Sequence, residues 1–455
     1  MDASPPIPSA RSPVDSAAVG RAWPVAFVFL VTLAAAIRLA EFIERYSVNV
    51  FFYDQWDFLR NFFAGDPSLS ALFYLQHGPH REGVGLLLDK YLYPLTSWNA
   101  RVDSYITWAC LIAAALLALE LKRRLFGRID YWDAVIPMLF LTLVQFDTFI
   151  VTPNPAYSGF PMLLLMLYLL ALLIGNEWLR YGAVLAINYL LIFTGFGIFM
   201  GVVTIALFAW LCYRSFRGFS PTPLAMPALG LLIAAASFAS FFYHYVFQSA
   251  VDCFTFPHYP LSDYPKFVAL MFSSALGIHG PRLFALLLGA ALLSAIVWTL
   301  AIALRRALAS DPLPPLPLVL SILIGYSTIF AVNTALGRVC LGLPQAAQPS
   351  RYATLMFPAL LGLYLHLRTL TPAALRPVAL TVLALALVPG HVHHPWEVAY
   401  YAERKNAWVQ CYRQNGNIGY CDGATHFKIY PDAARTKLQE KLDYLRLIRA
   451  NLFAD

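Results

Sequence analysis

Long apolar stretches separated by short polar segments run along most of this chain, and this pattern predicts helices that cross a membrane. An apolar run of about 17 to 25 residues can cross a bilayer as a helix, in which the backbone satisfies its own hydrogen bonds. The apolar positions form continuous runs and do not alternate, so a lipid-facing β-barrel is not expected. Eleven spans are predicted, at 23–45, 105–121, 133–151, 160–175, 181–194, 198–213, 224–247, 283–304, 315–333, 353–367 and 376–389.

The spans divide the chain into three parts. Residues 1–22 are rich in Pro, Ser and Ala and predict a disordered N-terminus in the cytoplasm. Residues 23–389 predict a transmembrane domain, and its first long loop, residues 46–104, is expected to carry short amphipathic helices on the membrane face. Residues 390–455 predict a small, partly helical tail. We expect the first apolar run to stay in place and not to act as a cleaved signal peptide, because no clear small-residue cleavage site closes it before Arg38.

Composition agrees with a membrane protein. Of the 455 residues, 59% are hydrophobic and 13% are charged, against roughly 25% charged in soluble domains. The net charge of +7 comes from short basic clusters beside the spans, such as 122–124 and 305–306, which favours topology signals over a nucleic-acid-binding patch. The positive-inside rule puts these clusters in the cytoplasm. Residues 46–104, 248–282, 334–352 and the tail are then expected outside, in a cytoplasmic (inner) membrane of bacterial type.

Four of the six cysteines fall in the segments expected outside, where the environment is oxidising. Cys411 and Cys421 flank a turn-forming stretch, and we expect them to form a disulfide. Cys253 and Cys340 are a second candidate pair, which the sequence leaves open. No CxxC spacing indicates a zinc site or a redox motif.

The first long loop begins with two carboxylates directly after the first span. Asp54 and Asp57 lie three residues apart, so they share a face if the segment is helical. A carboxylate flanked by aromatic residues at a membrane interface can have a raised proton affinity and can accept a proton from a hydroxyl group. The alternative interpretation is a helix N-cap at Asp54 and a solvated side chain at Asp57. Asp54 and Asp57 are therefore the candidate catalytic residues.

A second polar group follows in the same loop and contains His77, His80, Arg81 and Glu82. These side chains are candidates for substrate binding, through hydroxyl groups or phosphate. They could also join the aspartates as metal ligands, but no recognised metal-ligand spacing is present. No metal ligand is therefore assigned, and a divalent cation is left open as a cofactor. Arg81 fits best as an anion contact.

A third group lies just before the tenth span, at Arg338, Arg351 and Tyr352. A guanidinium group pairs with phosphate through two parallel hydrogen bonds, as a phosphodiester or pyrophosphate at the headgroup level would require. Both arginines lie on the side that the positive-inside rule leaves poor in basic residues. This favours a specific substrate-binding role over contact with bulk lipid phosphate.

The predicted arrangement of the chain resembles the GT-C superfamily of integral-membrane glycosyltransferases. It consists of one span, a large outer loop with an acidic motif and short interfacial helices, and about ten further helices. The resemblance covers most of residues 23–389 and rests on this topology and on the motif Tyr53-Asp54-Gln55-Trp56-Asp57. It implies an all-α polytopic membrane fold with about 11 transmembrane helices. It also implies an inverting enzyme that moves a sugar from a polyprenyl phosphate donor to a glycan, lipid or protein acceptor on the outer face.

The resemblance also suggests roles for individual residues. Asp54 matches by position the acidic residue that acts as general base or coordinates a metal in the family, with Asp57 as second choice. Arg338 and Arg351-Tyr352 resemble the later-loop residues that bind the lipid phosphate. The family often has Asp-Glu or Asp-x-Asp where this chain has Asp-Gln-Trp-Asp, which leaves the metal and the identity of the base open.

Two other function classes stay open. One is a transporter or flippase of lipid-linked saccharides, which would favour charged sites near the midplane and broken helices in paired halves. The other is a non-catalytic GT-C-like protein of polysaccharide assembly in the cell envelope. The charges here cluster at the outer interface, which favours the enzyme. The sequence has no P-loop, Rossmann fingerprint or GxSxG elbow, so nucleotide-driven transport and α/β-hydrolase chemistry have no support.

Overall fold

The computed structural model describes residues 13–219, 222–248, 251–280, 283–310, 313–392 and 396–454, with side chains described from residue 22 onward. The segment expected to be a disordered N-terminus lies largely outside these residues.

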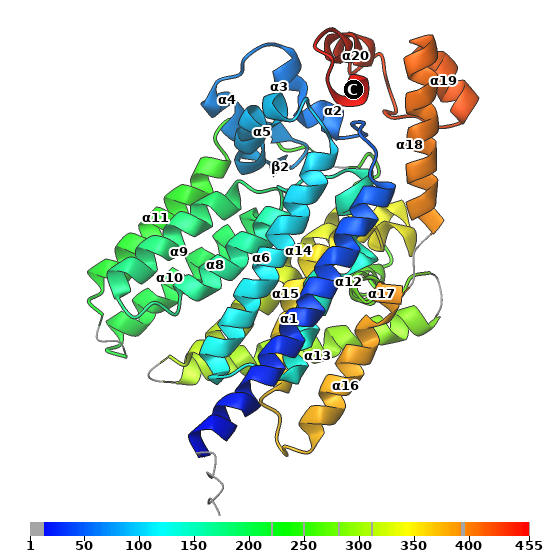
Figure 1. The fold of residues 1–455 in the computed structure, drawn as a ribbon. Coiled ribbons are helices and arrows are strands. Elements are labelled where there is room, and N and C mark those ends of the chain that lie inside the picture. Colours follow the sequence, from blue (N-terminus) through cyan, green and yellow to red (C-terminus); the bar gives the residue numbers. More distant parts are fainter. Residues whose placement is uncertain are drawn as a thin grey trace, which may run out of the picture.

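Helices form nearly all of the regular structure (Figure 1). The described residues contain six helices long and apolar enough to cross a membrane, together with shorter apolar helices. This confirms the predicted all-α polytopic membrane class. A single helix also lies at every predicted span except the third, which is divided. The helices of the bundle are α1 (Pro13–Tyr46), α6 (Arg101–Phe126), α8 (Gly159–Ala171), α9 (Glu177–Ile192), α10 (Ile198–Phe216), α11 (Ala225–Phe241), α12 (Asp263–Ala275), α13 (Leu283–Ala309), α14 (Pro315–Arg338), α15 (Ala353–Leu367) and α16 (Leu375–Leu387).

The third predicted span is not one continuous helix. It is divided into η1 (Tyr131–Ala134), α7 (Val135–Phe140), η2 (Leu143–Gln145) and η3 (Asp147–Val151). Polar side chains satisfy the backbone at these breaks: the Thr142 hydroxyl accepts from Val144 N at 3.3 Å, and Gln145 Nε2 donates to Phe140 O at 2.7 Å. Because the buried side chains replace the lost helical bonds, the apolar segment can change direction without unsatisfied backbone groups.

Helix α12 lies within residues 248–282, which were expected to form an outer loop. Residues Phe267 to Ala275 of this helix are buried, and it packs against α13, α14 and α15. Hydropathy did not reveal this helix, because 13 residues are too few to give a spanning signal, although protein surrounds the helix on several sides.

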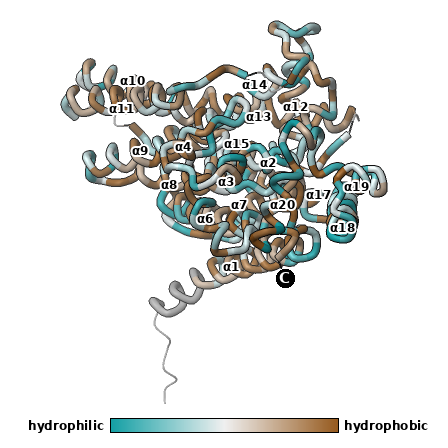
Figure 2. Tube along the Cα trace, turned by 90° about the horizontal axis from the view of Figure 1, so that it is seen from above, coloured by the Kyte–Doolittle hydropathy of each residue, from teal (hydrophilic) through white to brown (hydrophobic). Residues whose placement is uncertain are grey.

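The first long loop and the tail lie at the same end of the bundle, opposite the start of α1 (Figure 1). Seen from that end, the tail helix α18 is mostly hydrophilic, whereas α10 and α11 are mostly hydrophobic (Figure 2). The loop contains α2 (Gln55–Phe58), α3 (Arg60–Phe63), α4 (Leu69–Phe73), β1 (Gln76–His77), β2 (His80–Arg81) and α5 (Gly83–Leu95). The tail contains α17 (Pro389–Val392), α18 (Trp396–Asn415), α19 (Ile418–Thr425), α20 (Leu438–Leu447) and η7 (Asn451–Phe453).

Two buried lysines fasten the tail to the rest of the protein. Lys405 of α18 donates to the carbonyls of Ile150 and Val151 at 2.9 and 2.6 Å, where η3 ends. Lys441 of α20 donates to the carbonyl of Trp56 at 2.6 Å. The tail is therefore held directly against the loop that carries the candidate aspartates.

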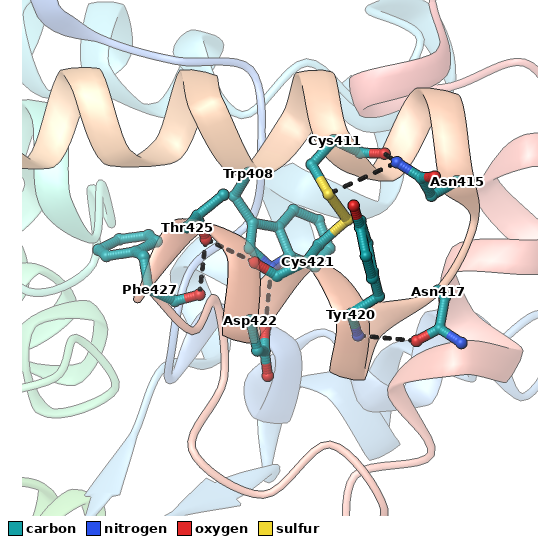
Figure 3. The surroundings of a disulfide bond; sticks show 9 residues. All are labelled: Trp408, Cys411, Asn415, Asn417, Tyr420, Cys421, Asp422, Thr425 and Phe427. Carbon is teal, nitrogen blue, oxygen red and sulfur yellow. Dashed lines mark hydrogen bonds between the residues drawn. A yellow bond between two sulfur atoms is a disulfide. The ribbon is translucent and has the colours of Figure 1, made fainter.

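Disulfides stabilise the same end of the molecule. The expected bond between Cys411 and Cys421 is present and joins α18 to α19 (Figure 3). The second candidate pair is also bonded, and Cys253–Cys340 ties the segment after α11 to the end of α14. Both pairings are thus confirmed.

Candidate functional site

The hairpin of β1 and β2 brings the two candidate histidines together. The strands are antiparallel, with His77 opposite His80 and Gln76 opposite Arg81. Gly78 in the turn has a φ of 54°, a left-handed conformation that favours glycine. The hairpin is fixed to the segment after α11, because the Gln76 amide exchanges two hydrogen bonds with the backbone of Val246, at 2.6 and 3.0 Å.

Arg81 has a structural role. Its residue is 1% exposed, and its guanidinium donates to the carbonyl oxygens of Tyr74, Phe241 and Tyr243, with 2.6 Å to Phe241. These bonds engage each nitrogen of the guanidinium group and join the first long loop to the end of α11, which favours a structural role over the predicted anion contact.

Arg338 and Arg351 meet at the ring of Tyr352. The guanidinium carbon Cζ of Arg338 lies 6.0 Å from the ring centroid, and that of Arg351 lies 5.6 Å from it, within the range of a cation–π interaction. Tyr352 is 3% exposed, and its hydroxyl has no hydrogen-bond partner. Two cationic groups and one free hydroxyl donor are thus gathered in one place.

This arginine pair lies at an apolar cavity of about 540 Å³. The cavity runs between α10, α11 and α14, and we call it the apolar cavity. Phenylalanine forms much of its wall: Phe196, Phe199, Phe238, Phe241, Phe242, Phe247, Phe254 and Phe256. His80, Arg338, Arg351 and Tyr352 also line it. The structure therefore joins four of the candidate residues, from two distant segments, at a cavity whose remaining wall is mostly hydrocarbon.

Burial and charge keep His80 neutral at this cavity. Burial first, and then the nearby His77 and Arg338, lower the pKa of His80 to about 3. The ring packs edge-on against Phe196, with 4.5 Å between the ring centroids. A neutral imidazole beside two arginines adds a hydrogen-bonding group without adding positive charge.

Asp54 lies beside the hairpin and acts electrostatically on Arg351. Its carboxylate is 62% exposed and comes within 4.0 Å of His77 Nε2. Desolvation lowers the pKa of Arg351, but anionic neighbours that include Asp147 and Asp54 outweigh this effect and raise it. Asp54 occupies the N-cap position of α2, yet its side chain makes no capping hydrogen bond. The N-cap interpretation thus lacks the bond it requires, and the carboxylate is free for other partners.

Glu82 lies beneath this surface and is 2% exposed. It accepts a hydrogen bond from Asn154 Nδ2 at 2.7 Å, and the hydroxyl of Tyr157 also interacts with its carboxyl group. Burial raises the pKa of Glu82, although the nearby His77 and the bond from Asn154 act in the opposite direction. Because Glu82 is enclosed by protein, it can position neighbouring groups but does not contact an exposed ligand directly.

Asp57 contacts the tail. It accepts a hydrogen bond from the Tyr430 hydroxyl of the tail at 2.7 Å. Asp57 and Tyr430 line a cavity of about 960 Å³ between the first long loop and the tail, which we call the polar cavity. His77 also lines it. Of the two candidate catalytic residues, Asp57 is therefore bonded to the tail, whereas Asp54 lies beside His77.

Sequence reasoning did not identify Asn154, Tyr157 or Tyr430. Asn154 and Tyr157 follow the third span in the stretch Pro153-Asn154-Pro155-Ala156-Tyr157, and the Tyr157 ring packs against His80 with 5.6 Å between centroids. A polar residue between two prolines at the end of a predicted span is a pattern from which this part of the site could have been predicted. Tyr430 carried no such signal, because its contact with Asp57 joins residues 373 positions apart.

Among the described residues, no group of three or more His, Cys, Asp or Glu side chains is arranged to hold a metal ion. The donor set at Asp54 and His77 contains only two such groups within 4.0 Å of each other. Metal sites in proteins usually have more ligands than this. We therefore assign no step to a metal ion.

Comparisons with known proteins gave two similar structures. No protein-family model matches the chain, and no curated protein matches it. The two solved structures are both ArnT from Cupriavidus metallidurans. The structure bound to undecaprenyl phosphate is 14% identical, and the match covers 95% of this chain and 77% of that chain, with a TM-score of 0.43. The apo structure is 16% identical, with 96% and 78% covered and a TM-score of 0.42. This chain is thus similar to ArnT along most of its length, at low sequence identity.

Proposed function

We propose that this protein is an inverting membrane glycosyltransferase that moves a sugar from a polyprenyl phosphate donor to a glycan, lipid or protein acceptor. The reaction takes place at the end of the bundle that carries the first long loop and the tail, on the outer face of a bacterial-type inner membrane. The N-terminus is then cytoplasmic and the C-terminus is outside.

The observation that supports this proposal most is the arginine pair at the end of a phenylalanine-lined cavity. A polyprenyl phosphate has a long hydrocarbon chain and a small anionic head. The apolar cavity suits the first part, since apolar walls bind hydrocarbon by excluding water. Arg338 and Arg351 suit the second part, because guanidinium groups form paired hydrogen bonds with phosphate. The hydroxyl of Tyr352, which has no partner, can donate a further hydrogen bond.

Asp54 is our candidate for the general base. It is exposed and acts electrostatically on Arg351, so an acceptor hydroxyl can reach it from solvent while the donor phosphate is held at the apolar cavity. Asp57 is the second candidate, although its carboxylate already accepts a bond from Tyr430. Glu82 is buried and His80 is neutral, and both position the hairpin side of the site.

In the proposed reaction the acceptor oxygen attacks the anomeric carbon and the bond from that carbon to the phosphate oxygen breaks. The proton of the acceptor hydroxyl passes to Asp54. The electron pair of the broken bond stays on the phosphate, whose added charge is stabilised by the two arginines. Direct attack inverts the anomeric centre, and because the leaving phosphate needs no proton, one protein base is enough. A glycosidase needs two carboxylates.

The test measures binding of the lipid head group. Purified full-length protein in detergent is mixed with undecaprenyl phosphate or with undecaprenol, and complexes are counted by native mass spectrometry. We expect the phosphate form to bind at least tenfold more tightly, and we expect this preference to be lost in the double variant Arg338→Gln, Arg351→Gln.

A matched control is Arg404→Gln together with Arg413→Gln, which removes the same charge from the tail helix α18 and should leave the preference unchanged. Equal binding of undecaprenol and undecaprenyl phosphate by the unmodified protein would contradict the proposal.

A further inference from the structure

The polar cavity lies directly beside the apolar cavity, and a thin wall separates them. On one side of this wall, Gln76, His77 and Gly78 line the polar cavity. On the other side, Pro79 and His80 line the apolar cavity. The β1–β2 hairpin is therefore the partition between the two spaces. Gln248 lines both, so they adjoin at a second point as well.

The polar cavity is also cationic. Four of its lining side chains are basic, namely Arg60, Arg435, Lys437 and Lys441, and two are acidic, namely Asp57 and Glu440. Lys437 and Glu440 form an ion pair at 3.4 Å, and each offsets the charge of the other. Three cationic groups then face the single carboxylate of Asp57. A space of about 960 Å³ with this excess attracts an anion of more than atomic size.

The free donors in this cavity belong mainly to its arginines. The Arg60 guanidinium makes one long hydrogen bond, 3.4 Å to the carbonyl of Gln76. Arg435 is exposed and acts electrostatically on Tyr430 across the cavity. Lys441, by contrast, already donates to Trp56 O and Thr436 Oγ1, at 2.6 and 2.8 Å. Arg60 comes from the first long loop and Arg435 from the tail, so a ligand bound between them contacts both segments.

We propose that the polar cavity binds the acceptor, and that this acceptor is a saccharide carrying an anionic group, either phosphate or carboxylate. The anionic group pairs with Arg60 and Arg435, and the sugar hydroxyls face Asp57, Tyr430 and His77. His77 lies 4.0 Å from Asp54, so a hydroxyl at this edge of the cavity is close to the candidate base. The acceptor role rests on the proposed function, whereas the binding of an anionic sugar does not.

The test compares three sugars that share one ring: glucose 6-phosphate, glucuronic acid and glucose. Binding to the full-length protein in detergent is measured by saturation-transfer NMR titration at low salt. We expect at least one anionic sugar to bind tenfold or more tightly than glucose, and the better of the two identifies the anionic group. We also expect 0.5 M NaCl to weaken this binding strongly, because salt screens charge.

The variant Arg60→Gln, Arg435→Gln should weaken binding of the preferred anionic sugar about tenfold or more, which corresponds to about 1.4 kcal/mol. Both side chains are exposed, so folding should be preserved, and Arg435→Gln alone provides a second, milder test. The control is Arg449→Gln, an exposed arginine of the tail that does not line the cavity. It should leave the affinity unchanged.

The two proposals fail in different ways. If the three sugars bind equally well, or if Arg449→Gln weakens binding as much as the cavity variants do, the anionic acceptor is wrong, even where undecaprenyl phosphate still binds. If the anionic sugar binds through Arg60 and Arg435 but undecaprenyl phosphate shows no preference over undecaprenol, the glycosyltransferase proposal fails and the anionic sugar site stands.

Discussion

Arg338 and Arg351 lie thirteen positions apart in the sequence, and their guanidinium carbons approach the same ring of Tyr352 to 6.0 and 5.6 Å. Like charges repel each other, so the arrangement needs compensating groups, and one of them is Asp147, whose carboxylate lies 3.9 Å from Arg351. The face of an aromatic ring supplies part of this compensation. An anion bound at the two arginines would add to this compensation, which is why this relationship is central to the proposed lipid phosphate site.

The first prediction concerns this ring. Tyr352→Phe keeps the ring and removes the hydroxyl, whereas Tyr352→Leu removes the aromatic face as well. We expect Phe to weaken undecaprenyl phosphate binding severalfold, through the lost donor, and Leu to weaken it more, since each cation–π contact is worth roughly 0.5–1 kcal/mol. Affinities for undecaprenyl phosphate, measured by native mass spectrometry, test the predicted order of the two variants. Equal losses in both variants would mean that only the hydroxyl matters.

The second prediction concerns the base. Asp54→Asn keeps the size of the side chain but cannot accept the proton, so sugar transfer should fall by a factor on the order of 10²–10⁴. The carboxylate is 62% exposed and caps no helix, so the melting temperature should stay the same. Transfer is measured in a strain from which the gene has been deleted. The unmodified protein should restore the cell-envelope glycan in this strain, and the Asp54→Asn variant should not.

The matched control for Asp54 is Asp66→Asn, on the same loop, where the carboxylate pairs with Lys90 at 2.5 Å. It should retain activity. Full activity of Asp54→Asn would remove Asp54 as the base and leave Asp57 as the remaining candidate.

The third prediction separates Arg81 from the binding arginines. Arg81→Gln removes the donor to the carbonyls of three residues, of which the Phe241 carbonyl is buried, and a buried unsatisfied group costs about 1–3 kcal/mol. We expect a clear drop in the melting temperature measured in detergent, whereas Arg60→Gln, on an exposed arginine of the same loop, should leave it nearly unchanged. An unchanged melting temperature for Arg81→Gln would restore the anion contact as an explanation.

The fourth prediction concerns the disulfide next to the arginine pair. Cys340 follows Arg338 by two positions and is bonded to Cys253. Breaking a native disulfide usually costs 2–4 kcal/mol. We expect Cys340→Ser to lower the melting temperature and to weaken undecaprenyl phosphate binding, because the end of α14 is then less fixed. Cys212→Ser, which replaces a free cysteine, is the control. Peptide mapping without reductant should recover both bonded pairs.

The fifth prediction is a pH dependence. The pKa of His80 is lowered to about 3 in the folded protein, against about 6.5 in an unfolded chain. Between these values the unfolded state binds more protons, so stability falls as the pH falls below 6.5. At pH 5 the loss is about 2 kcal/mol at most. His80→Gln should reduce this acid sensitivity, and the exposed His426→Gln should not. Thermal unfolding at pH 7.5 and 5 measures the difference.

Much of the fold follows from local properties of the sequence. Each spanning segment is a continuous apolar run, and a helix is the structure that satisfies its backbone without water. The two differences from the predicted elements have a common cause. The third span contains Thr142 and Gln145, which satisfy backbone groups at its breaks, and α12 is short but enclosed by neighbouring helices. Neither property can be seen in hydropathy, because both depend on what surrounds the segment.

The sequence by itself determined that ionisable residues gather in the first long loop and before the tenth span, and which residue types they are. Only the tertiary structure decided their surroundings. It enclosed Arg81 among carbonyls, directed Asp57 to Tyr430 of the tail, and set Arg338 and Arg351 against one ring beside an apolar cavity. The physical reason is that a charged side chain takes its role from its neighbours, and these neighbours lie up to 373 positions away along the chain.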